Sequence, residues 1–172
     1  MVHLTEKRVK RAEKDGAKMA VEVVAVESKK LDNKLFYTCS LIEQIGRDSN
    51  NERFAVVQAL GKENIARIYE YSDVFHCERI EAASAKWREK CDIVDGGFDN
   101  ISTCRYRLPT CWDIGKVYCR LIQSLGGDPI DTLVEVYSSW LAPKIDNYNI
   151  AVYYMSSAYL FESYKEGNLL EA

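Results

Sequence analysis

Residues able to act as nucleophiles or general bases are few in this sequence. It holds two histidines, His3 and His76, and six cysteines. A Cys–His pair needs both side chains on one side of the fold, and Cys77 would point about 100° away from His76 on a helix. A partner for His76 would have to come from the cysteines at 104 and 111. A histidine hydrogen-bonded at a helix junction explains His76 more simply, so we predict no catalytic residue.

The cysteine spacing does not favour a metal site. Structural zinc sites usually contain two close ligand pairs such as Cys-x-x-Cys, whereas Cys104, Cys111 and Cys119 are separated by six and seven residues. No glycine loop of the Walker A or Gly-x-Gly-x-x-Gly type is present to bind a phosphate. We therefore predict free thiols, no metal and no cofactor. An enzyme or zinc protein centred on His76 or the loop cysteines is a third interpretation.

Two basic clusters are candidates for contact with an anion or a nucleic acid. Residues 1–34 contain nine Lys or Arg against six Asp or Glu. The densest part of this arm is Lys7, Arg8, Lys10 and Arg11. The second cluster is Arg105-Tyr106-Arg107, in which two cations flank a ring that can stack on a base. Solvated faces or internal ion pairs explain both clusters more simply, so a nucleic-acid-associated regulator is the alternative and not the favoured function.

Tyrosines are concentrated near the carboxyl end, where six lie between residues 137 and 164. A tyrosine is apolar on its ring and polar at its hydroxyl, which suits either the rim of a core or a protein interface. We predict an interface, shared with another protein or with a second copy of the chain. The candidate interface residues are Trp140, Tyr148, Tyr153, Tyr154, Tyr159 and Tyr164.

The elements that must position these residues are predicted to be helices. In the first half we expect a helix over about 5–30, in which the β-branched run 19–27 also permits a strand. The next begins at Asp32 and ends at Gly46. A capping box at Ser49 and Glu52 would begin another, ending at Gly61. Two more cover 63–76 and 78–90.

Regular spacing fails over residues 92–111, which hold Gly96, Gly97 and Pro109. We predict a long irregular loop there, with a short strand pair (98–101 with 104–108) as an option. Helices resume at a capping box formed by Thr110 and Asp113 and again at Asp128-Pro129, and the last covers about 147–164.

Together these patterns predict an all-α, single-domain bundle of about seven or eight helices over residues 1–172. Its amino-terminal helices span about 5–90 and its carboxyl-terminal helices about 112–165. The composition is ordinary for a globular protein, with 47% hydrophobic residues and a net charge of −3. No apolar run approaches the roughly 18 residues of a membrane span, and charges break any leader at the start. We therefore expect a cytoplasmic, non-enzymatic protein that acts through contact with a protein partner or with itself.

Overall fold

The computed structural model describes residues 30–171. The chain divides into two units, residues 1–30 and residues 31–172, and every described helix belongs to the second unit. The predicted helix over 5–30, with its ambiguous run 19–27 and the basic residues Lys7, Arg8, Lys10 and Arg11, lies outside the described residues.

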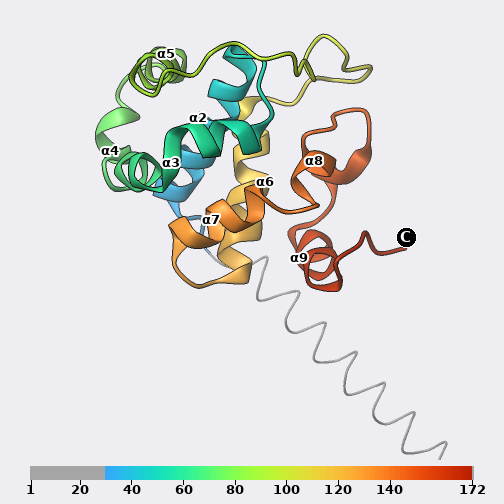
Figure 1. The fold of residues 1–172 in the computed structure, drawn as a ribbon. Helices are drawn as coiled ribbons and strands as arrows, with labels where there is room; N and C mark the ends of the chain where they lie inside the picture. Colours follow the sequence, from blue (N-terminus) through green and yellow to red (C-terminus); the bar gives the residue numbers. More distant parts are fainter. Residues whose placement is uncertain (1–29, 172) are drawn as a thin grey trace, which may run out of the picture. The chain divides into compact units, whose positions relative to one another are not determined.

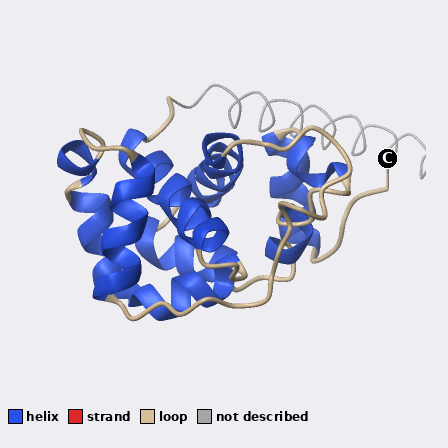
Figure 2. Cartoon of the chain, turned by 90° about the horizontal axis from the view of Figure 1, so that it is seen from above, coloured by secondary structure: helices blue, strands red, loops and turns tan. Residues whose placement is uncertain are grey.

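The all-α prediction is confirmed, since residues 30–171 form helices and loops and contain no strand (Figures 1 and 2). In chain order the helices are α2 (Asn33–Asp48), α3 (Arg53–Glu70), α4 (Ser72–Phe75), α5 (Ile80–Lys90), α6 (Cys111–Leu125), α7 (Pro129–Tyr137), α8 (Ala142–Ile145) and α9 (Ser157–Glu166), with a short 3₁₀ helix, η1 (Ala151–Tyr154), before α9.

Helix α2 is the central element, and it packs against α6, α3 and α5 (Figure 1). It begins where predicted, because the Asp32 carboxylate accepts hydrogen bonds from the amides of Lys34 and Leu35. The predicted stop at Gly46 is wrong, since α2 continues to Asp48. Gly46 instead provides space, because a Cβ there would lie 2.7 Å from Cδ of Arg53.

The beginning of α3 also differs from the prediction. Ser49 is the C-cap of α2, where its hydroxyl donates to the Ile45 carbonyl, and α3 starts only at Arg53, so the predicted capping box with Glu52 does not form. Glu52 precedes α3 and makes no side-chain cap. The predicted break at Gly61 is confirmed as a kink within α3, where glycine adopts a φ of 70°.

In the second half the predicted helix starts are confirmed. Thr110 and Asp113 form a reciprocal capping box at α6, and Asp128 caps α7 with Pro129 in the first turn. The predicted single helix over 147–164 is wrong. It is divided into η1 and α9 because Met155 and Ser156 are extended, and Ser156 caps α9 through the amide of Tyr159.

Helices α2 and α6 approach each other closely at Gly115. A Cβ at this position would meet the backbone nitrogen and Cα of Ser40 at 2.7 Å. Only a residue without a side chain permits this contact between two helix backbones, because neither backbone can give way cheaply.

The predicted irregular loop is confirmed, but it is tied down at both ends. The strand pair proposed within it does not form. Near its start, the amides of Gly96 and Phe98 donate to the carbonyls of Ser49 and Asn50, each at 2.8 Å. Its second half is fastened by Asn149 to the segment before η1 (Figure 1).

A buried charged network joins α2, α3, the loop and the residues after α8. The Glu43 carboxylate accepts hydrogen bonds from Nε and Nη2 of Arg53 (2.7 and 2.9 Å), from Nε of Arg47 (2.5 Å) and from the Tyr148 hydroxyl. Arg53 also donates to the side chain of Asn100 at 3.2 Å. Burial alone would raise the pKa of Glu43, but the guanidinium groups and the tyrosine outweigh burial and lower it to about 2.

Candidate functional site

The Arg105-Tyr106-Arg107 triplet and the tyrosine-rich segment near the carboxyl end, which the sequence analysis singled out separately, meet at one surface. Asn149 joins them, because its side-chain oxygen accepts from the amide of Arg105 at 2.8 Å and its side-chain nitrogen donates to the carbonyl of Thr103 at 3.0 Å. Both bonds hold the loop by its backbone. The side chains of the Arg105-Tyr106-Arg107 triplet are not used in this attachment and are exposed, and those of Tyr106 and Arg107 line a groove with Asn149 and residues of η1.

Three tyrosines lead from the core to this surface. Tyr148 is buried in the charged network, and the ring of Tyr153 contacts its edge at 5.6 Å between centroids. The ring of Tyr154 lies 4.4 Å from that of Tyr153, and 68% of Tyr154 is exposed. The buried members of this row therefore fix the position of the exposed one.

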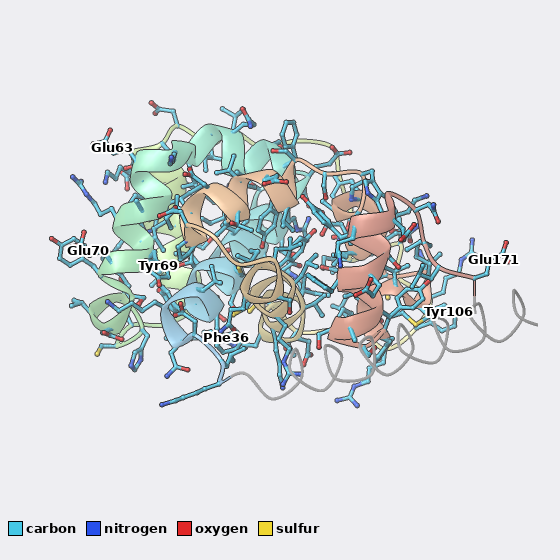
Figure 3. The ribbon with its side chains drawn as sticks, turned by 90° about the horizontal axis from the view of Figure 1, so that it is seen from below. Phe36, Glu63, Tyr69, Glu70, Tyr106 and Glu171 are labelled. Atoms are coloured by element: carbon cyan, nitrogen blue, oxygen red, sulfur yellow. The ribbon has the colours of Figure 1, made fainter. Side chains whose placement is uncertain are left out.

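Two grooves adjoin the exposed end of the row and share Arg107, Tyr153 and Tyr154. The first, about 340 Å³, is completed by residues 108–110, Asp113 and Lys116. The second, about 400 Å³, is completed by Tyr106 and residues 148–151. Tyr106 is 69% exposed and lies at the opposite end of the molecule from Glu63 and Glu70 (Figure 3). We call the triplet, Lys116, Tyr153 and Tyr154 the Arg–Tyr surface.

The Arg–Tyr surface is positively charged. None of Arg105, Arg107 and Lys116 forms an ion pair within the described part of the chain. The one carboxylate in the grooves, Asp113, is occupied by the backbone amide and hydroxyl of Thr110, and these hydrogen bonds lower its pKa. Arg107 and Lys116 thus line the grooves beside two exposed aromatic rings, and Arg105 precedes one of these rings in the chain.

The other predicted interface residues lie elsewhere or serve the fold. The hydroxyl of Tyr159 donates to the carbonyl of Leu170 at 2.8 Å, and that of Tyr164 donates to Glu135 at 3.0 Å. Trp140 is half-buried just after α7. Tyr148 is almost completely buried, so it supports the surface and does not form it.

The third interpretation, an enzyme or zinc protein centred on His76 or the loop cysteines, gains no support from the described residues. His76 is exposed at the end of α4, in a hollow that also contains Asp73, Glu78 and Trp112. Residues 30–171 contain no group of three or more His, Cys, Asp or Glu placed to hold a metal ion. Burial raises the pKa of the Cys111 thiol to about 11, which leaves it protonated and unreactive at neutral pH.

Sequence reasoning missed the buried charged network. Glu43 and Arg47 stand four residues apart on the buried helix α2, which is a spacing that helical periodicity can detect. Nothing local identifies Arg53, Asn100 and Tyr148 as their partners.

Comparison with protein-family models, with curated proteins and with solved structures finds no match to this chain. None of the described helices is both long enough and apolar enough to cross a membrane.

Proposed function

We propose that this chain is a non-enzymatic protein-interaction domain and that the Arg–Tyr surface is its binding face. One observation carries the proposal: Arg107 of the basic loop triplet and the pair Tyr153 and Tyr154, more than 40 residues apart in sequence, line two adjoining grooves, and Tyr106 joins them in the second. Tyrosine and arginine are the residue types enriched at protein interfaces and at their energetic centres.

The construction of the surface supports this role. Tyr154 rests on Tyr153, which rests on Tyr148, so binding does not need to order a mobile ring. Asn149 fixes the loop backbone in the same way. A preorganised aromatic contact loses little conformational entropy when a partner binds.

The charge of the surface selects the partner. Arg105, Arg107 and Lys116 would attract a protein segment that carries carboxylates between apolar side chains. A symmetric dimer that placed this surface against itself would bring these cations together. A second copy could still bind head-to-tail through its acidic body, because residues 35–172 hold 14 Lys or Arg against 20 Asp or Glu.

A nucleic acid is the less favoured ligand for the same surface. Tight binding to a phosphate backbone typically uses about 6–10 basic contacts, and the Arg–Tyr surface supplies three cations. The six cysteines are all unpaired, which supports the expected cytoplasmic location, where thiols remain reduced.

The test is fluorescence polarisation with a labelled peptide that alternates glutamate with leucine, compared with a peptide in which glutamine replaces glutamate. We expect Arg107→Glu and Tyr154→Ala each to weaken binding of the acidic peptide at least tenfold. The control is Arg79→Glu, whose exposed arginine lies before α5 and outside both grooves. Equal binding of the two peptides, or equal loss in the control, would contradict the proposal.

Light scattering on the same proteins decides whether the partner is a second copy. A mass well above 19.7 kDa that returns to 19.7 kDa in Tyr154→Glu would identify self-association through this surface. Tighter binding of a single-stranded oligonucleotide than of the acidic peptide would favour the nucleic-acid alternative.

A further inference from the structure

A separate pocket of about 210 Å³ lies between the start of α3, the irregular loop and the α7–α8 connection. Phe54, Phe98 and Pro143 form its apolar walls. Asp146, only 3% exposed, forms its base, and the exposed Glu52 lies at its rim. The volume is below the usual range for drug-sized ligands, so it suits a small molecule.

The serine oxygens that line this pocket are ready to accept hydrogen bonds. Ser138 and Ser139 use their hydroxyl protons on the carbonyls of Val134 and Val136, both at 2.6 Å. Their oxygens therefore present lone pairs. A ligand that matches this pocket must supply hydrogen-bond donors.

The two carboxyl groups add negative charge to this set of acceptors. Oδ1 of Asp146 accepts the Tyr118 hydroxyl at 2.8 Å, while no residue between 30 and 171 donates a hydrogen bond to Oδ2. Glu52 forms neither an ion pair nor a side-chain cap among the residues described. Arg53 lies behind Phe98, with its guanidinium carbon 5.6 Å from the centre of the ring; it attracts Asp146, but its hydrogen bonds are made to Glu43 and not to Asp146.

We propose that this pocket binds a small primary ammonium ion with a compact apolar body. The ammonium group donates its three hydrogen bonds to Asp146 and the two serine oxygens, Glu52 attracts the cation from the rim, and the body lies between the two phenylalanines and Pro143. A carboxylate ligand is repelled by Asp146 and Glu52, and a neutral ligand gains no electrostatic attraction from these two carboxyl groups.

Binding of such a cation is coupled to the release of a proton. Burial raises the pKa of Asp146 to about 7; Arg53 opposes this shift, Glu43 adds to it, the Tyr118 hydroxyl opposes it, and Glu52 adds to it. An ammonium ion beside Asp146 favours the ionised form. Affinity should therefore rise between about pH 6 and pH 8 and then level off.

Isothermal titration of the full chain with 2-phenylethylammonium tests the proposal, with 2-phenylethanol, 3-phenylpropionate and methylammonium as matched probes. We expect 2-phenylethylammonium to bind at least tenfold tighter than each of the other three. The alcohol lacks the charge, the acid reverses it, and methylammonium lacks the apolar body. Saturable binding that is equal for the alcohol and the amine, or absent for the amine, overturns the proposal.

Variants separate this site from nonspecific attraction of a cation. Asp146→Asn should weaken binding at least tenfold and remove its pH dependence. Because Asp146 is buried, the exposed Glu52→Gln and Phe54→Ala provide a second test, and each should weaken binding several-fold with the fold intact. Glu63→Gln, a carboxylate outside the pocket, is the control and should change nothing. Unchanged binding in both Glu52→Gln and Phe54→Ala would refute the site.

Discussion

The buried pair of Glu43 and Arg53 provides the sharpest test of the fold. Both side chains are fully buried, and Glu43 accepts two hydrogen bonds from Arg53, one from Arg47 and one from Tyr148. Glu43→Gln keeps the shape but removes the charge, so it leaves the Arg53 guanidinium buried without its counter-ion. Breaking a buried pair from one side costs about 3–5 kcal/mol.

That loss is a large share of the stability of a typical domain, which is about 5–15 kcal/mol. Urea unfolding at pH 7, followed by the fluorescence of Trp87, Trp112 and Trp140, measures it directly. The double variant Glu43→Leu with Arg53→Met removes both fully buried charges and leaves only the partly exposed Arg47 without its partner. We expect it to be more stable than Glu43→Gln, which leaves both guanidinium groups without a counter-ion. Glu78→Gln, which breaks an exposed ion pair with Lys86, is the control and should cost at most about 1 kcal/mol.

The pH dependence follows from the same bonds. Glu43 has a lowered pKa of about 2 in the folded state, so its contribution is complete above about pH 4.5 and is lost as the pH falls towards 2. Glu43→Gln should flatten the stability profile over that interval. A Glu43→Gln protein within about 1 kcal/mol of the parent, with an unchanged acid limb, would refute the account of this network.

Three further expectations concern single positions. Asp146 has a raised pKa of about 7, so its ionisation lowers the free energy of unfolding as the pH rises from about 4 to 7. Asp146→Asn should remove that decline in urea titrations at several pH values. An unchanged dependence of stability on pH would contradict it. Gly115→Ala should destabilise the domain by about 1–3 kcal/mol, because the new methyl group meets the backbone of Ser40; a neutral result in thermal unfolding would show that α2 and α6 can separate without cost. Thr110→Ala should cost about 1 kcal/mol in thermal unfolding by removing the cap of α6, and an unchanged stability would contradict the role of this cap.

Local chemistry made part of this fold predictable. The starts of α2, α6 and α7 follow from Asp32, Thr110 and Asp128, because each side chain satisfies amides two or three residues away. The predicted box at Ser49 did not form because a serine between two helices can end the first or begin the second, and Ser49 is the C-cap of α2 while α3 starts at Arg53. Choosing between those two uses requires knowing where α2 ends, and that depends on packing.

The candidate site was also predictable only in part, because the sequence shows its residues but not their contact. Tyrosine excess and the Arg105-Tyr106-Arg107 triplet are visible in the sequence, but their meeting depends on Asn149, whose hydrogen bonds span 44 and 46 residues. The local sequence also does not show why the last predicted helix divides at Met155. Its aromatic residues fit a helical period, whereas contact with Tyr148 places Tyr153 on a 3₁₀ turn.

The partners in the Glu43 network are far apart in sequence, which affects how the domain folds during translation. Glu43 and Arg53 leave the ribosome early, yet Asn100 follows Arg53 by 47 residues and Tyr148 follows Glu43 by 105. Until then, a nascent domain that closed around α2 and α3 would enclose charges with incomplete partners. The amino-terminal helices are therefore expected to remain loosely packed through most of translation and to close when residue 148 emerges. Chains that terminate before this tyrosine should consequently be recognised as unfolded, even though they contain most of the helices.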